Sequence, residues 1–202
     1  DPVITYVARN LEPYRGFHVF MRALEKIQRE HKTCHAVIVG GDDVSYGSKP
    51  KDAPNWREKM LSEVSLDPTR THFMGKLPYE TYKTVLQVSA AHVYLTYPFV
   101  LSWSMLEAQA SGCLIIGSST SPVEEIIQPG LTGYLADFHD PQKIARTTVE
   151  ALADSKHFAG IKLNAINATH TRLNLSNGHA AYFQMLRSKQ LDDNNSYPSK
   201  AA

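Results

Sequence analysis

The segment at residues 92–112 constrains the fold more than any other part of the chain. His92-Val93-Tyr94-Leu95 combines β-branched and aromatic side chains in the manner of a buried strand. A loop with two serines follows, and Ser104-Met105-Leu106-Glu107 has the Ser-x-x-Glu pattern of a helix N-terminus. Open α/β sheets bind ligands where strands pass into helices, outside the carboxyl ends of the strands. We therefore expect the candidate active cleft over Thr96 to Gly112.

Strand and helix patterns alternate along the rest of the chain. The predicted strands are residues 3–8, 35–39, 71–74, 92–95, 114–117 and 133–136. The predicted helices are residues 16–31, 56–66, 78–88, 141–153 and 175–188, with two more beginning near Ser104 and at Ser121. Such alternation predicts a parallel sheet with helices on both faces. We expect a single doubly wound, Rossmann-like α/β domain over residues 1–189, and a disordered tail over residues 190–202.

Two further patterns support this organisation. The first predicted helix carries an apolar stripe at i, i+3, i+4 and i+7 spacing, made of Phe17, Phe20, Met21, Leu24 and Ile27. The connection at residues 42–55 is polar and long for a loop between a strand and a helix. Loops of this length are usually either functional or disordered.

Composition limits the classes of partner. The 202 residues are 43% hydrophobic and 20% charged, with net charge +1 and a pI near 8.0, which argues against a nucleic-acid surface or a polybasic membrane patch. The apolar runs are too short to span a bilayer, and no signal peptide is visible. Cys34 and Cys113 lie in or beside apolar runs and are predicted to be buried free thiols, which fits a reducing compartment.

Two arginines flank the loop after the first predicted strand. Arg9 follows the strand and Arg15 precedes the first helix, so both can reach the edge of the sheet where the cleft is expected. Two guanidinium groups over a helix N-terminus would form a clamp for a diphosphate, because arginine matches phosphate oxygens bidentately. The alternative is that both are surface arginines, solvated or paired with Glu12.

Two residues of the cleft segment also have two interpretations. Glu107 either completes a capping box with Ser104 or accepts hydrogen bonds from a sugar diol. Trp103 either stacks on a ligand or fills the core between helix and sheet, and we favour the core. Elsewhere the sequence has no P-loop, no zinc-binding histidine pair and no Gly-x-Ser-x-Gly motif. Metal, ATP-type and hydrolase sites are therefore not predicted.

Five motifs in order resemble a known family. They are YVARNLEPYRGF at 6–17, HAVIVGG at 35–41, HFMGKL at 72–77, SWSMLEAQASG at 102–112 and PVEEIIQPGLTGYL at 122–135. Together they resemble the C-terminal, donor-binding half of GT-B retaining glycosyltransferases of the family 4 type, over the chain up to about Arg187. Each motif is weak by itself, but five at matching intervals are fairly specific.

The resemblance assigns roles to individual residues. It implies that Arg9 and Arg15 hold the diphosphate of a nucleotide sugar, with Arg15 in place of the family's lysine, and that Glu107 binds the nucleotide ribose. It further implies that the backbone of Gly75, Lys76 and Leu77 frames the nucleobase. The backbone over Leu101, Ser102, Trp103, Ser104 and Met105 would hold the phosphate and the sugar. The family's first glutamate, which contacts the donor sugar, is replaced by Phe99 on direct count or by Tyr97 after a small insertion.

The resemblance also implies a reaction. A sugar would move, with retention of configuration and without a bound metal or other cofactor, from a UDP- or GDP-linked donor to an acceptor glycan or lipid, as in polysaccharide biosynthesis. The acceptor would bind an N-terminal domain that is absent here, so the chain alone should be inactive. The expected location is the cytoplasm, or the inner face of the membrane for the full-length protein. A non-catalytic nucleotide-binding domain and a GT-B sugar epimerase are the alternatives that stay open.

Overall fold

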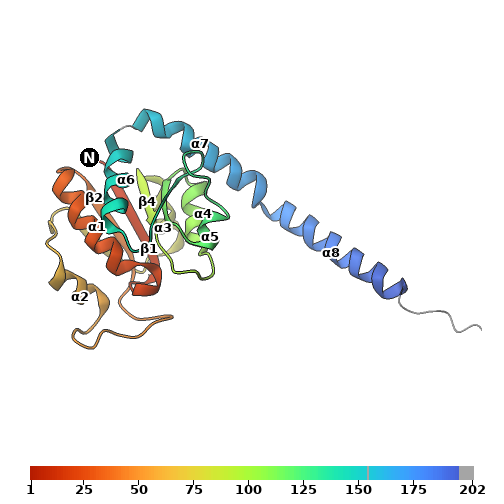
Figure 1. Ribbon diagram of the computed structural model, residues 1–202, viewed down its shortest axis with the longest axis horizontal. Coiled ribbons are helices and arrows are strands. Elements are labelled where there is room, and N and C mark those ends of the chain that lie inside the picture. The colour runs from red at the N-terminus through yellow and green to blue at the C-terminus, as the bar shows by residue number, and fades with distance from the viewer. Residues whose placement is uncertain (154, 196–202) are drawn as a thin grey trace, which may run out of the picture.

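A six-stranded parallel sheet forms the centre of the molecule. The computed structural model describes residues 1–153 and 155–195 (Figure 1). The strands are β1 (Val3–Asn10), β2 (His35–Gly41), β3 (Thr71–Gly75), β4 (Ala91–Tyr94), β5 (Leu114–Ser118) and β6 (Tyr134–Ala136). They lie in the order β3-β2-β1-β4-β5-β6, and every neighbouring pair is parallel. This is the doubly wound Rossmann-like order, and it confirms the predicted fold class.

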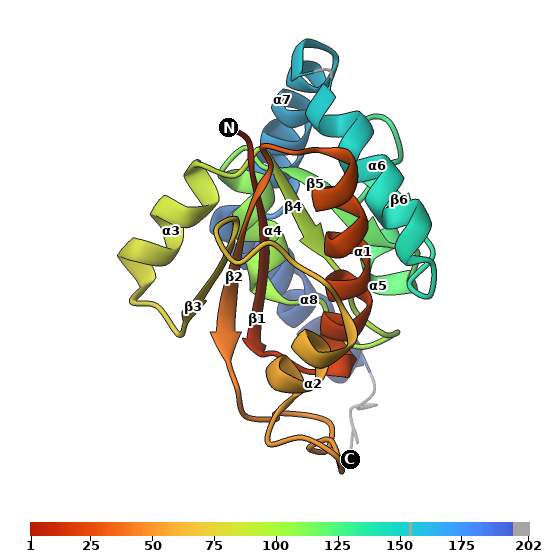
Figure 2. The same ribbon diagram turned by 90° about the vertical axis from the view of Figure 1, so that its left-hand side faces the viewer.

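Helices cover both faces of the sheet. They are η1 (Pro13–Arg15), α1 (Phe17–Glu30), α2 (Trp56–Glu63), α3 (Tyr79–Gln87), α4 (Trp103–Ala110), α5 (Ser121–Glu124), α6 (Pro141–Ala153), α7 (Ser155–Arg172) and α8 (Leu175–Asn195). Helices α1 and α6 lie on one face of the sheet, and α3 and α4 lie on the opposite face (Figure 2). Buried side chains of α1 and α6 form one core against the sheet, and those of α3, α4 and α5 form a second core.

The apolar stripe of α1 explains how that helix packs. Its five predicted residues are all fully buried in the larger core. Gly16 begins the helix with a φ of +70°, and a Cβ at this position would lie 2.4 Å from the Cβ of Leu95. The helix can therefore approach the end of β4 only because residue 16 has no side chain.

The chain after α6 differs from the prediction. The sequence predicted no helix between residues 154 and 174, yet α7 fills most of that interval and packs against α4 and α6. Helix α8 then extends away from the domain (Figure 1) and continues through Asn195. The predicted tail at residues 190–202 is therefore helical over its first six positions, and residues 196–202 lie outside the described part of the chain.

The Ser-x-x-Glu patterns at residues 104–107 and 121–124 do not cap α4 and α5. Ser102, not Ser104, caps α4, and its hydroxyl accepts the N–H of Ser104 at 3.4 Å. Thr120 precedes α5, and its side chain makes no capping hydrogen bond. The Ser-x-x-Glu pattern occurred inside the first turn in both cases, so pattern alone placed the cap one or two residues too late.

The order of the strands reverses between β1 and β4. These two strands pair only at Ile4 with Ala91 and at Thr5 with His92. Beyond Thr5 they diverge, and the chain leaving β1 and the chain leaving β4 pass to opposite sides of the sheet. In open α/β sheets, this switch point at the carboxyl ends of the strands is the crevice in which ligands bind. The predicted cleft segment follows β4 directly.

Both cysteines are buried free thiols, as predicted. Burial raises the pKa of each thiol, Cys34 and Cys113, to about 11. Among the described helices, none combines the length and the apolar character that a membrane span requires.

Two histidines should make the fold sensitive to acid. Burial lowers the pKa of His92 from 6.5 to about 4, and burial together with Arg22 lowers the pKa of His18 to about 4. Between pH 6.5, the ordinary histidine pKa, and about pH 4, the pKa in the folded chain, the unfolded chain binds more protons than the folded chain. The free energy of unfolding therefore falls as the pH falls from 6.5. We expect His92 alone to contribute a slope of up to about 1.4 kcal/mol per pH unit.

Urea denaturation between about pH 7 and pH 5 measures how the free energy of unfolding changes with pH, above the range in which most carboxyl groups titrate. His18→Gln should flatten it, while the exposed His170→Gln on α7 should not. Stability that stays constant over this range would contradict the assignment.

Candidate functional site

Arg15 is fixed in the crevice by several contacts. Its Nη1 donates to the hydroxyls of Tyr94 at 3.2 Å and Thr96 at 3.0 Å, and to the carbonyl of Val100 at 3.1 Å. All three acceptors belong to β4 and the loop that follows it. The guanidinium is therefore held between the two diverging strands, where it can present its remaining N–H groups to a ligand.

Aromatic rings surround this guanidinium. Its carbon lies 5.6 Å from the ring centre of Tyr46 and 5.5 Å from that of Phe99. The ring centres of Tyr46 and Phe99 are 5.0 Å apart, and Tyr14 packs edge-on against Phe99 at 5.8 Å. Phe99, the position of the family's first glutamate on direct count, is thus part of an aromatic wall around Arg15. Tyr97 instead packs on Phe138, with ring centres 4.5 Å apart.

Arg9 contacts a different set of residues. It is exposed at the end of β1 and lines a hollow of about 470 Å³ with Asn10, residues 43–45, Lys49 and Lys76. Glu12 pairs with neither arginine. The structure therefore excludes the ion pairs with Glu12 that the sequence left open, and places Arg9 and Arg15 in separate surroundings at the same edge of the sheet.

Some backbone N–H groups at the start of α4 already have hydrogen-bond partners. The N–H of Ser102 donates to the phenol oxygen of Tyr94 at 2.8 Å, and the hydroxyls of Ser102 and Ser104 are 2.9 Å apart. Since the Tyr94 oxygen already accepts from Ser102 and Arg15, its own proton can be donated further. Burial raises the pKa of Tyr94, which keeps the phenol protonated. The side chains of Leu101 and Met105 pack in the smaller core.

The prediction for Trp103 is wrong. The side chain is 79% exposed at the first turn of α4 instead of filling the core. Val100, three residues earlier in the chain, is 71% exposed. The rim of the crevice therefore presents apolar surface to solvent. The apolar pattern of the sequence could not show whether Trp103 is buried or exposed. At this turn of α4 the core contact is made by Met105, two residues later.

Glu107 is held by two phenols. Its Oε1 accepts from the hydroxyl of Tyr79 at 3.1 Å and its Oε2 from that of Tyr82 at 2.9 Å. Burial and the bond to Glu107 raise the pKa of Tyr82 well above its usual value, so this phenol stays a donor. Glu107 therefore does not complete a capping box. Its carboxylate is oriented between α3 and α4 and keeps lone pairs for a diol.

The predicted nucleobase segment joins β3 to α3. Gly75 ends β3 with a φ of +63°, Lys76 is exposed, and the side chain of Leu77 packs on the smaller core. Leu77 lies close in sequence to Tyr79 and Tyr82, which carry the hydroxyls on Glu107. The segment therefore leads from the end of β3 directly to the carboxylate.

A buried carboxylate orders the long loop after β2. Glu12 is 1% exposed, and its two oxygens accept the backbone N–H groups of Ser45 at 3.0 Å, Tyr46 at 3.2 Å and Gly47 at 2.9 Å. The backbone carbonyl of Glu12 also accepts from Arg15 at 3.3 Å. One residue thus positions both Arg15 and the ring of Tyr46 that lies beside it.

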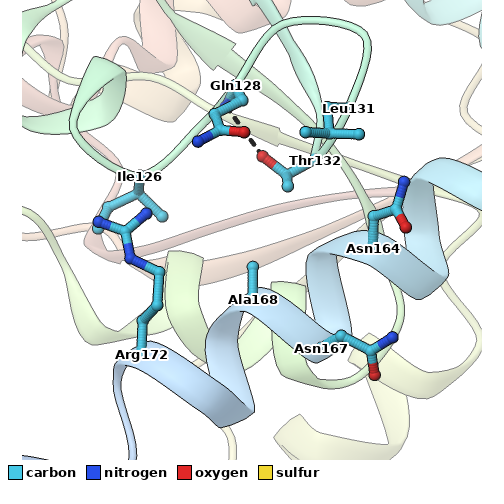
Figure 3. A pocket seen from close by; sticks show the side chains of 8 residues that line it. All are labelled: Ile126, Gln128, Leu131, Thr132, Asn164, Asn167, Ala168 and Arg172. Carbon is cyan, nitrogen blue, oxygen red and sulfur yellow. Dashed lines mark hydrogen bonds between the residues drawn. The ribbon is translucent and has the colours of Figure 1, made fainter.

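A second hollow lies away from the crevice (Figure 3). It has a volume of about 250 Å³ between the segment after α5 and helix α7, and its lining residues are Ile126, Gln128, Leu131, Thr132, Asn164, Asn167, Ala168 and Arg172. None of the predicted site residues lines it. It lies where the chain enters β6, at the amino edge of the sheet, whereas ligands of open α/β sheets bind at the carboxyl edge.

Several residues of the crevice were not predicted. Tyr79, Tyr82, Tyr94 and Thr96 each direct a hydroxyl to Arg15 or Glu107, and Asn10 and Lys49 line the hollow beside Arg9. The tyrosines of α3 lie at i and i+3, a spacing that places them on one face of the helix. The spacing of the two tyrosines was the signal that the sequence offered. It does not reveal that their hydrogen-bond partner, Glu107, lies on α4.

The comparisons with known proteins agree with the fold. Residues 1–154 match the family model described as glycosyl transferases group 1. The D-inositol 3-phosphate glycosyltransferases of Corynebacterium efficiens and Corynebacterium glutamicum are each 26% identical over 76% of this chain. The chain belongs to the group 1 glycosyltransferase family. It spans about a third of the length of these relatives, 35% and 36%.

Solved structures show the same fold. Anabaena HepE in complex with UDP-glucose superposes with a TM-score of 0.76 at 19% identity, over 92% of this chain and 48% of that one. The C-terminal domain of the Francisella tularensis group 1 glycosyltransferase LpcC gives 0.73 at 20% identity, over 86% of this chain and 87% of that domain. The architecture is thus that of the C-terminal GT-B domain.

Removal of the Glu12 charge should loosen the loop at residues 45–47. Glu12→Gln replaces an oxygen that accepts backbone N–H groups by an amide that donates, so at least one buried N–H loses its partner. We expect the free energy of unfolding to fall by about 1–3 kcal/mol. Amide hydrogen exchange of Ser45 to Gly47 should also accelerate.

Urea denaturation and exchange measured by NMR test this prediction. The control is Glu30→Gln, an exposed residue at the end of α1, which should change neither quantity. Equal effects of the two substitutions would show that the buried carboxylate does not hold the loop.

Proposed function

We propose that this chain is the donor-binding half of a retaining glycosyltransferase that moves a sugar from a nucleotide diphosphate sugar to an acceptor. The observation that carries the proposal is the crevice between β1 and β4. Arg15, held by acceptors of β4 and the loop after it, and Glu107, held by two phenols of α3, are the two groups that a nucleotide sugar requires. The family and the fold support glycosyl transfer, and these residues add the chemistry.

The diphosphate would bind between Arg15 and the start of α4. Arg15 is already held by three acceptors, so little side-chain freedom is lost on binding. The phenol proton of Tyr94 and the backbone N–H of Trp103, the first of α4, would add donors, and Arg9 would approach from the end of β1. These charges would stabilise the departing diphosphate as the bond from sugar to phosphate breaks, the role that a metal ion has in other enzymes.

The nucleoside would extend towards α3. Glu107 would accept hydrogen bonds from the ribose hydroxyls, with Tyr79 and Tyr82 as positioning residues. The backbone at Gly75, Lys76 and Leu77 would frame the base. The complexes of HepE with UDP-glucose and with UDP make a uridine nucleotide the first donor to test, with GDP-linked donors as the comparison.

The donor sugar would lie beside Phe99 and Trp103. Backbone groups of Leu101 to Ser104 would contact its hydroxyls, and the exposed Trp103 would stack on the sugar ring or on the acceptor. The aromatic wall around Arg15 would exclude water from the breaking bond. Retention, the metal-free reaction and a cytoplasmic or membrane-surface location belong to this proposal, as does an acceptor glycan or lipid bound mainly by another domain.

Phe99 supports a second candidate function. A non-catalytic nucleotide-binding domain would keep Arg15 and Glu107 but would not need the carboxylate that the family places at Phe99. A full-length protein that binds a nucleotide sugar without transferring or hydrolysing it would favour this candidate. A sugar epimerase, the other alternative, would form its product without any acceptor.

Binding of UDP should depend on Glu107 and its tyrosines. Fluorescence of Trp103, isolated in a Trp56→Phe background, can report binding because Trp103 lies exposed at the start of α4. We expect Glu107→Gln to weaken UDP binding about tenfold or more, and Tyr82→Phe to weaken it less, by about threefold, since it only orients the carboxylate.

Calorimetry of the same variants confirms the stoichiometry. Glu80→Gln on α3 and Tyr182→Phe on α8 are the matched controls, because both residues are exposed and lie outside the crevice. Saturable UDP binding that Glu107→Gln leaves unchanged would place the nucleotide elsewhere and overturn the proposed site.

Turnover by the full-length protein should depend on Arg15 and not on a metal. We expect Arg15→Ala to lower kcat about 100-fold, in the range observed when one group that stabilises the transition-state charge is removed, and Arg15→Lys to restore part of it. Excess EDTA should leave the rate unchanged. A rate abolished by EDTA and restored by Mg²⁺ would contradict the metal-free mechanism.

A further inference from the structure

A basic hollow lies at the carboxyl ends of β1, β2 and β3. Its volume is about 470 Å³, and its lining residues are Arg9, Asn10, Asp43, Val44, Ser45, Lys49 and Lys76. The three cations come from three distant parts of the chain: the end of β1, the loop after β2 and the residue after β3. Three positive groups face one negative group, so the hollow attracts anions.

These cations form no ion pair in the part of the chain that the structure describes. Over residues 1–153 and 155–195, no ion pair involves Arg9, Lys49 or Lys76. Two basic residues of α2, the helix that follows this loop, are paired: Arg57 with Asp42 at 3.0 Å and Lys59 with Glu63 at 3.4 Å. Unpaired like charges around one hollow repel each other, and a bound anion relieves that repulsion.

The floor of the hollow carries an unpartnered hydrogen-bond acceptor. Asn10 is only 5% exposed; its Nδ2 donates to the hydroxyl of Ser45 at 2.8 Å, while its Oδ1 is buried without a partner. Buried polar atoms are normally satisfied. A hydroxyl of a bound molecule would supply the missing donor.

Gly41 leaves the space in which these groups meet. A Cβ at this position would lie 2.5 Å from the Cε of Lys76 and 2.6 Å from the Oδ1 of Asn10. The ammonium of Lys76 and the amide of Asn10 therefore both lie over the backbone of Gly41, at the end of β2. A side chain at residue 41 would fill the floor of the hollow.

This hollow differs from the nucleotide crevice. Its lining ends at Lys76 and includes neither Arg15 nor Glu107, nor any residue of the α4 segment. Two lining residues also belong to the proposed donor site: Arg9 through its side chain and Lys76 through its backbone. The tests below therefore leave Arg9 out and change only the side chain of Lys76. Lys49, Lys76 and Asn10 define the separate part.

We propose that this hollow binds an anionic sugar, with its phosphate or carboxylate on Lys49 and Lys76 and a hydroxyl on Asn10. The volume lies within the range of pockets that hold small molecules. The proposal that the hollow binds an anion depends only on the residues that line the hollow. Its role, as the site of a charged acceptor group next to the donor, rests on the proposed function.

Calorimetric titration of the 202-residue chain with glucose 6-phosphate, glucuronate and glucose tests the proposal. We expect saturable binding of at least one anionic sugar and none of glucose at equal concentration; the comparison of the two anions separates phosphate from carboxylate. Lys49→Gln and Lys76→Gln should each weaken binding about fivefold or more. Gly41→Ala should weaken it without changing charge.

The control is Lys51→Gln, an exposed lysine of the same loop that does not line the hollow. An equal loss in this variant, competitive displacement by UDP, or absence of binding by both anions would each overturn the proposal. UDP titrations of the same variants separate the two claims. Binding of glucose 6-phosphate without binding of UDP would contradict only the proposed donor site.

Discussion

The geometry of the carboxyl edge depends on one buried carboxylate. Glu12 lies directly after β1, and burial of a charged group is costly unless hydrogen bonds satisfy it. Backbone N–H groups of Ser45, Tyr46 and Gly47 provide those bonds, so a loop without regular structure is folded over the end of the sheet. The same residue accepts the N–H of Arg15. Both the crevice and the basic hollow take their walls from this arrangement.

Around this anchor the site is arranged before any ligand binds. Arg15 rests on acceptors from β4 and the loop after it, and Glu107 rests on two phenols of α3. Preorganised groups lose little conformational entropy on binding and need little rearrangement as charge develops. The divergence of β1 and β4 beyond Thr5 supplies the space between them. The strand order provides the space for a ligand, and the anchored loop and the hydrogen bonds fix the residues around it.

The sequence predicted the elements better than their contacts. Alternating patterns located all six strands, and the stripe of α1 is fully buried as expected. Helix α7 was missed because Gly160 and several Asn and Thr residues obscure its apolar face. Trp103 and the caps of α4 and α5 were wrong, since exposure and capping depend on the tertiary path of the chain. The roles of Tyr82 and Asn10 required neighbours that lie far away in sequence, which periodicity does not reveal.

The most direct test of the central claim is a crystal structure of this chain with UDP. The account predicts density in the crevice between β1 and β4, with the ribose hydroxyls in hydrogen-bonding distance of Glu107 and the diphosphate between Arg15 and the first turn of α4. Density for UDP in the hollow between α7 and the segment after α5, or with its diphosphate on Lys49 and the side chain of Lys76 in the basic hollow, would contradict it.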